Sequence, residues 1–288
     1  MNDLGFGHWD LGFNTLVHNP FVAETLEGWS VLHLMYRVRW DRLRDRTSSD
    51  RERMAAEVVQ ALAAPDAGSH AVVQVLGHKA DLMFICFRRG FDEAAQTQLA
   101  LSRTELHDAL EATSSYVSVV ELGMYEMTAK IHEQLGARFK PGSDEFEKAF
   151  DNEMETQRQR VMSRLFLAMP KARYVCFYPM NKRRGEAVNW YSETFARRAS
   201  MMREHGMIGR QYAGRVTQVI SGSIGFDDWE WGVDLFAEDP LVFKKLIYEM
   251  RFDEASAKFA EFGPFYTGLQ FAPAKLGEYL NGSVPALS

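Results

Sequence analysis

The chain has 288 residues, of which 46% are hydrophobic and 25% charged, and its formal net charge is -6. A chain of this length can bury one large core or two smaller ones, so two domains of roughly 140 residues each are expected. The acidic balance argues against nucleic acid as a partner, because domains that bind nucleic acid carry basic stripes.

The N-terminus, the apolar runs and the cysteines indicate the cellular compartment. The first residues, MNDLGFGHWDLGFNTL, lack both the basic segment and the long apolar segment of a secretion signal. No charge-free stretch of about eighteen apolar residues is present, so we expect no membrane span. Cys86 and Cys176 lie in apolar runs, which is typical of core residues in a reducing compartment. We therefore expect a cytoplasmic protein.

The first half of the chain predicts the order β-α-β-β-α-β, after an extended arm over residues 1–25. Alternating apolar residues predict the strands, and Ser48 or Ser49 is the expected N-cap of the first helix. The expected elements are a strand over 27–40, a helix over about 50–63, a turn over 65–68, strands over 70–77 and 80–89, a helix over 91–112 and a strand over 115–121.

The second half repeats this order after a strongly charged segment, 125–163, which we expect to contain helices and a long connection. The expected elements are a strand over 173–178 broken by Pro179, a helix over about 189–205 ending at His205-Gly206, strands over 216–224 and 229–237, one long helix over about 241–262 and a strand over 265–271. Two such ferredoxin-like units commonly join their sheets into one barrel. The prediction is an α+β fold, a dimeric α+β barrel in one chain, with domains 1–165 and 166–288.

His205 and Tyr178 are the first candidates for chemistry, and each has a structural alternative. His205 shares a helix face with Met201 and Met202, where a neutral imidazole suits an axial iron ligand. A histidine is equally favourable at the end of a helix before a glycine. Tyr178 is either a redox tyrosine or a tyrosine at the edge of the core.

Further polar residues are consistent with a planar, anionic, redox-active ligand such as a porphyrin with propionates. The basic loop after the strand, which contains Lys182, could neutralise carboxylates or simply be solvated. Arg251 and Ser256 are placed on the late helix, where they reach a ligand from different directions or belong to a solvated surface. Gln218 lies in a strand and needs hydrogen-bond partners if it is buried. Motifs of hydrolases, zinc proteases and P-loop proteins are absent from the sequence.

Several runs resemble the coproheme decarboxylases, also called HemQ, of the chlorite dismutase superfamily. The resemblance covers nearly all of 164–268 and rests on FYPMNKRR, NWY, REHGMIGRQYAGRVTQVISGSIGFDDWEWGVDLF and YEMRFDEASAKFAEFGPFYTG. A weaker resemblance is visible in LEGWSVLHLMYRVRW, HAVVQVLGHKADLMFICFR and SYVSVVEL. It implies an enzyme that uses hydrogen peroxide to convert two propionates of iron coproporphyrin III (coproheme) to vinyls, giving heme b.

The resemblance also implies the central site residues. The family's axial iron ligand falls on His205, and its radical-forming tyrosine falls on Tyr178. The position on the other face of the porphyrin falls on Gln218. Chlorite dismutases have an arginine there, so the glutamine disfavours chlorite chemistry. The alternatives are a chlorite dismutase-like or peroxidase-like protein and a heme-binding protein without turnover.

The remaining family positions are contacts with the substrate. The catalytic lysine on the propionate side falls on Lys182, and a substrate-contacting methionine falls on Met180. Residues that hold propionates fall on Arg164, Arg251 and Ser256. The family implies a homopentamer, and a ferrochelatase is a possible transient partner. This chain departs from the family over 125–163, where a charged segment replaces the loop that covers the substrate entrance.

Overall fold

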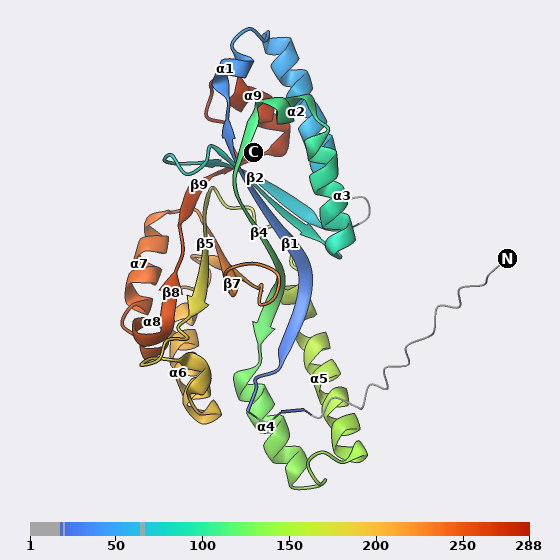
Figure 1. Ribbon diagram of the computed structural model, residues 1–288, viewed down its shortest axis with the longest axis vertical. Coiled ribbons are helices and arrows are strands. Elements are labelled where there is room, and N and C mark those ends of the chain that lie inside the picture. The colour runs from blue at the N-terminus through green and yellow to red at the C-terminus, as the bar shows by residue number, and fades with distance from the viewer. Residues whose placement is uncertain (1–17, 20, 64–66) are drawn as a thin grey trace, which may run out of the picture.

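The computed structural model describes residues 18–19, 21–63 and 67–288 (Figure 1). Most of the arm expected over 1–25 and part of the turn expected over 65–68 lie outside the described residues. The first half has the expected β-α-β-β-α-β order. Its elements are β1 (Thr25–Val38), α1 (Trp40–Leu43), α2 (Ser48–Leu62), β2 (Ser69–Val75), β3 (Leu82–Arg88), α3 (Phe91–Ser102), a 3-10 turn (Glu105–Ala109) and β4 (Leu110–Gly123).

Two boundaries in the first half differ from the prediction. The helix expected over 91–112 ends at Ser102, and the following 3-10 turn buries Leu106 before β4 begins. The N-cap of α2 is Thr47, which forms a capping box with Asp50, and not Ser48 or Ser49. In both cases several adjacent polar residues could mark the boundary. The capping box selects Thr47 as the start of α2, and the turn that buries Leu106 follows the end of α3.

The second half repeats the order and adds two helices before it. Its elements are α4 (Tyr125–Gly136), α5 (Asp144–Leu165), β5 (Tyr174–Lys182), a 3-10 turn (Trp190–Ser192), α6 (Phe195–Arg210), β6 (Thr217–Gly222), β7 (Trp231–Ala237), α7 (Leu241–Met250), α8 (Glu254–Phe259), β8 (Ala260–Phe262), β9 (Tyr266–Phe271), a 3-10 turn (Pro273–Lys275) and α9 (Leu276–Leu280).

Within the described residues the strands form one sheet that closes on itself. Their order is β7-β6-β4-β1-β3-β2-β9-β5-β8, and β7 also pairs with β5. The first half contributes β4-β1-β3-β2 and the second β6-β7-β5-β9, which is the same arrangement of equivalent strands. The halves meet where β4 pairs with β6 and β2 with β9. The predicted pairing of two ferredoxin-like units into a barrel is therefore confirmed.

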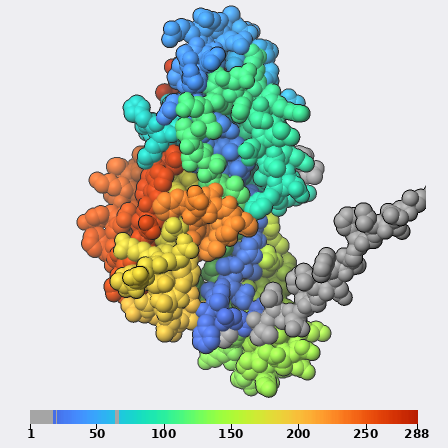
Figure 2. Space-filling model, viewed as in Figure 1, coloured from blue at the N-terminus to red at the C-terminus, as the bar shows by residue number. Residues whose placement is uncertain are grey.

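Helices cover the outer face of the barrel differently in the two halves. In the first half α2 and α3 pack on the sheet together with the C-terminal helix α9, which buries Leu276, Tyr279 and Leu280. In the second half α6 and α7 contribute side chains to the layer that covers the sheet, and α8 packs against α6. Figure 2 shows the two halves as adjacent parts of one body. The C-terminal helix thus fills the layer in the first half only.

Strand β5 continues through Pro179, whereas the sequence analysis placed its end at this residue. Pro179 lies opposite Gly232 of β7, and its carbonyl accepts a hydrogen bond from Gly263. Carbonyl and N–H of one residue point to the same side of an antiparallel strand, so the missing N–H faces the gap between β9 and β8. Proline is tolerated there because no ladder hydrogen bond is lost.

The predicted ends of two helices are also wrong. Helix α6 continues past His205 and Gly206 to Arg210, so His205 does not lie at a helix C-terminus. The single helix expected over 241–262 is divided into α7 and α8 by a turn that ends with Asp253 as the N-cap of α8. Aspartate is common at an N-cap because its carboxylate accepts hydrogen bonds from the free backbone N–H groups of the first turn.

The charged segment 125–163 forms helices, as expected, in a hairpin of α4 and α5 at the lower end of the molecule in Figure 1. The hairpin has its own small core of Ile131, Leu135, Phe146 and Phe150. None of the helices in the described ranges combines the length and the apolarity needed to cross a bilayer.

Candidate functional site

The layer between the barrel and the helices of the second half contains the candidate site. Side chains alternate along β5, so Val175 and Phe177 face the barrel interior, while Cys176, Tyr178 and Met180 face outward. The outward residues pack in a cluster that includes residues of α6, α7 and β7. The predicted catalytic tyrosine and substrate-contacting methionine therefore share one face of β5.

His205 is anchored from the protein side by a buried carboxylate. Its Nδ1 lies 3.0 Å from Oδ2 of Asp253 and 3.3 Å from Oγ of Ser256. The Asp253 side chain is 1% exposed, whereas 28% of the His205 side chain remains accessible. Among the described residues Nε2 has no hydrogen-bond partner. A histidine that binds a metal usually has its second nitrogen fixed by a carboxylate in this way, so the residues fit an axial iron ligand.

Asp253 is held in its charged form. Burial alone would raise the pKa of its carboxyl group, but the hydrogen bond and the attraction of His205 lower that pKa below its ordinary value. Ser256 adds hydrogen bonds from its backbone N–H at 2.8 Å and from Oγ at 3.2 Å. The serine predicted to hold a propionate thus supports the carboxylate behind His205 in this structure.

Tyr178 is enclosed by aromatic rings and is 5% exposed. Its ring stacks on Phe265 at 4.5 Å and lies 5.8 Å from Phe262. Burial raises the pKa of the phenol, and Arg251 opposes this effect. The Arg251 guanidinium lies 4.0 Å from the centre of the Phe262 ring. The structure therefore brings Arg251 close to Tyr178 and keeps the phenol protonated.

Gln218 reaches the helix face that carries His205. It lies opposite Leu235 in the ladder, and both face outward from the barrel. Its Nε2 lies 3.5 Å from the position that a Cβ would occupy at Gly209. Gly209 follows His205 by four residues and so lies on the same face of α6. Gln218 and His205 thus both border the layer between α6 and the barrel.

Lys182 is the last residue of β5 and is 8% exposed, so it does not belong to the solvated loop. Its Nζ donates to the carbonyl of Ala255 at 3.1 Å and lies 4.5 Å from the centre of the Trp190 ring. Burial lowers the pKa of Lys182 to about 8, although Asp253 and Glu230 oppose the shift. The lysine is therefore linked to the first turn of α8, whose cap holds His205.

The lowered pKa predicts a specific dependence of stability on pH. Burial lowers the pKa of Lys182 from 10.5 to about 8, so between these values the unfolded chain binds more protons than the folded chain. Stability therefore rises with pH across this range, by up to about 3 kcal/mol. Urea unfolding of the wild type and of Lys182→Met should show the wild type gaining stability relative to the variant as pH rises. A constant difference across this range would contradict the prediction.

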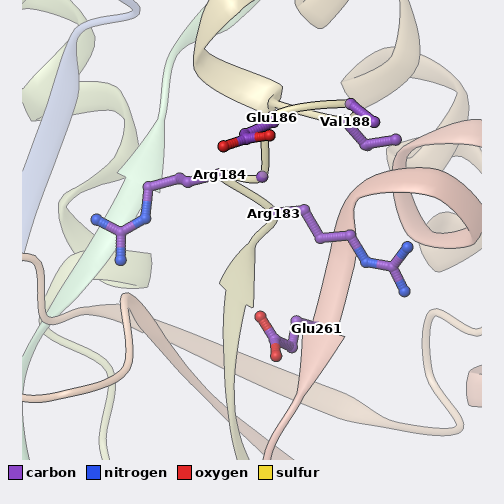
Figure 3. Close-up of a pocket in the computed structure, with 7 residues that line it drawn as sticks. Arg183, Arg184, Glu186, Val188 and Glu261 are labelled. Carbon is purple, nitrogen blue, oxygen red and sulfur yellow. The ribbon is translucent and has the colours of Figure 1, made fainter.

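The basic loop after Lys182 borders a cavity of about 580 Å³ (Figure 3). Arg183 and Arg184 point away from each other across it, and Glu186 and Glu261 lie on opposite sides. Nε of Arg184 lies 3.4 Å from Glu230. Both arginines are exposed, in agreement with the solvated alternative for this part of the loop.

Arg164 does not lie with the other predicted site residues. It lies in the last turn of α5, is exposed and forms no ion pair or hydrogen bond with any described residue. Helix α5 contacts α4, β1 and β4. A role of Arg164 in propionate binding remains a prediction.

Asp253 is the residue that the sequence analysis missed. It was placed on a long helix, where its side chain would face solvent. The available signal was an aspartate three residues before Ser256, which is a common start of a helix.

Replacing Asp253 by asparagine is expected to weaken the binding of ferric coproporphyrin III, the ligand that the family resemblance implies, by about 10- to 100-fold. The predicted axial ligand His205 would lose its charged partner. The dissociation constant can be measured by titration of the Soret band. Glu254→Gln is the matched control, since the ion pairs of Glu254 with Arg197 and Lys258 lie on the surface. Equal affinities of the Asp253 and Glu254 variants would contradict the anchoring role.

The chain forms a closed barrel of two ferredoxin-like units, and a carboxylate anchors a histidine on an outer helix. These features define the class as a dimeric α+β barrel protein with a histidine suited to bind a metal. The model of the family described as chlorite dismutase matches residues 51–271, and the chain belongs to this family.

Similar proteins carry two kinds of name. The chain is 42% identical to a coproheme decarboxylase of Staphylococcus carnosus, over 85% of this chain and 93% of that protein. It is 43% identical to a coproheme decarboxylase of Thermus thermophilus, over 87% of this chain and 93% of that protein. A putative heme-binding protein of Natronomonas pharaonis is 44% identical over 88% of this chain, but the chain spans only 40% of its length.

Solved structures agree in fold. A heme-binding protein from Thermus thermophilus superposes with a TM-score of 0.75 at 41% identity, covering 92% of this chain and 99% of that one. A chlorite dismutase from Candidatus Nitrospira defluvii has a TM-score of 0.67 at 18% identity, covering 88% and 95%. At 18% identity, the similarity to the chlorite dismutase shows a shared fold and nothing more.

Proposed function

We propose that this chain binds iron coproporphyrin III and, with hydrogen peroxide, converts two of its propionates to vinyls, giving heme b and carbon dioxide. The main support is the pair formed by His205 of α6 and Asp253 at the N-cap of α8, because His205 borders the same layer as the buried phenol of Tyr178. Relatives with 42–43% identity that are named coproheme decarboxylases add support.

In this proposal Nε2 of His205 binds the iron of the substrate, and Asp253 fixes the ring so that Nε2 presents its lone pair. The substrate's own iron, with peroxide, supplies the redox chemistry. Tyr178 gives up an electron and its proton, and then takes a hydrogen atom from the propionate carbon next to the ring. Loss of carbon dioxide leaves the vinyl group, and the second electron returns to the oxidised substrate. Each propionate thus loses two electrons, which reduce one peroxide to water.

Charged groups near Tyr178 would position the propionates. Arg251 lies close to the phenol, and Lys182 lies at the end of the same strand. Hydrogen bonds between such cations and carboxylates are short and directional. Met180 would contact the porphyrin from the face that carries Tyr178, and Gln218 would offer a neutral amide from β6.

The proposal extends to domains and assembly. Apart from Arg164, all the predicted site residues lie in 166–288, so this part would bind the porphyrin, while 1–165 would complete the barrel. The filling of the equivalent layer in the first half by α9 supports a single site. We further propose a cytoplasmic homopentamer that receives its substrate from a ferrochelatase.

Incubation of the purified protein with ferric coproporphyrin III and hydrogen peroxide tests the function. Mass spectrometry should show two successive losses, each of one carbon dioxide and two hydrogens. A porphyrin that binds but keeps its mass would leave a heme-binding protein without turnover. Oxygen evolution on addition of chlorite would instead indicate a chlorite dismutase.

A further inference from the structure

Arg198 of α6 is buried, and it has no charged partner within the described residues. It is 9% exposed, and its Nη2 donates to the backbone carbonyl of Phe21. Its Nε is buried and has no hydrogen-bond partner in the part of the chain that the structure describes. No carboxylate among the described residues forms an ion pair with Arg198. A carbonyl oxygen carries only a partial charge, so the positive charge of the guanidinium is not neutralised.

A second buried arginine has all its guanidinium nitrogens hydrogen-bonded. Arg88 is 0% exposed, but Nε and both Nη atoms are hydrogen-bonded to Thr97 and to three backbone carbonyls. One of these carbonyls, that of Leu62, belongs to the end of α2, where the helix dipole favours a cation. Arg88 is therefore satisfied by the protein itself, whereas Arg198 retains a free N–H.

Arg198 lies on the helix face that carries His205. The two residues are seven positions apart, which corresponds to two turns and about 10 Å along the helix. Met201 lies between them on the same side and packs against Trp190, Ala255 and Phe259. A ligand bound to Nε2 of His205 that extends toward the N-terminus of α6 therefore approaches Arg198.

A buried guanidinium without an anion is unfavourable, and a bound carboxylate would remove this cost. The proposed substrate carries carboxylates at the edge of its ring. We propose that Arg198 binds one of the propionates of the porphyrin. This inference rests on the proposed function and adds a contact from α6, whereas Arg251 lies just after α7 and Lys182 at the end of β5.

Binding measurements with paired ligands test this inference. Soret titrations compare ferric coproporphyrin III with its methyl ester, whose carboxylates are blocked, for the wild type, Arg198→Gln and Arg198→Lys. Arg198→Gln should bind the free acid about 10- to 100-fold more weakly and the ester unchanged. Arg198→Lys keeps the charge but loses the planar fork, so about a threefold loss for the acid is expected.

The control is Arg203→Gln, because Arg203 is exposed on the same helix and pairs with Glu126 on the surface. It should bind both ligands as the wild type does. The quantity compared is the ratio of the affinity for the free acid to the affinity for the methyl ester. If this ratio is the same in the wild type and in both Arg198 variants, the inference is overturned. If Arg198→Gln does not fold, the ratio of acid to ester affinity in Arg198→Lys, compared with that in the wild type, is the test. If the wild type does not bind ferric coproporphyrin III, the proposed function fails and the inference fails with it.

Discussion

Tyr178→Phe is expected to bind ferric coproporphyrin III normally and to release carbon dioxide at least about a hundredfold more slowly, equivalent to about 3 kcal/mol in the barrier. The phenyl ring preserves the packing against Phe262 and Phe265, so the aromatic surroundings of the side chain are kept. In the proposed mechanism the lost hydroxyl is the group that gives up its hydrogen and then takes one from the propionate. Carbon dioxide release and the product masses after addition of peroxide measure the effect.

Tyr116→Phe is the matched control. Tyr116 is also buried, but it faces the barrel interior, where its hydroxyl donates to the carbonyl of Trp229. Removing that hydroxyl should leave turnover near the wild-type rate. If Tyr178→Phe produced heme b as fast as this control, the tyrosine role would be wrong.

The largest effect on stability is expected at the His33–Asp234 pair inside the barrel. Both side chains are 0% exposed, and Nε2 of His33 lies 3.0 and 3.1 Å from the two carboxylate oxygens. His33 belongs to β1 and Asp234 to β7, so the pair joins the halves. The His33 ring also stacks at 4.0 Å on Phe177, the residue before Tyr178. The pair therefore supports the strand that carries the candidate catalytic residue.

His33→Leu should lower the free energy of unfolding by about 3–5 kcal/mol, because it leaves a buried carboxylate without its partner. The double variant His33→Leu/Asp234→Leu removes both polar groups and should recover most of this loss. Urea unfolding of the wild type, His33→Leu, Asp234→Leu and the double variant forms a complete cycle. Additive losses would show that the two side chains contribute independently.

The architecture was predictable because it depends on alternation of apolar residues. Strands such as β5 and β7 show that pattern clearly, and the repeated order of elements led to the paired ferredoxin-like units. The ends of elements were less predictable. Gly206 has the residue type of a helix end, yet α6 continues to Arg210, because interactions with the rest of the fold outweigh one glycine.

The site was predictable only in part. The positions of His205, Tyr178, Met180 and Gln218 around one layer agree with the family resemblance. The contact between Asp253 and His205 depends on the turn that separates α7 from α8, which helical periodicity did not reveal. The burial of Lys182 and Arg198 depends on packing with α8 and the segment around Phe21, which is distant in sequence.

The most direct test of the account is the structure of the protein in complex with ferric coproporphyrin III. We predict that the iron is bound by Nε2 of His205, and that one propionate lies within hydrogen-bond distance of the Tyr178 hydroxyl. An iron bound to another residue, or a porphyrin whose propionates all lie away from Tyr178, would contradict the account.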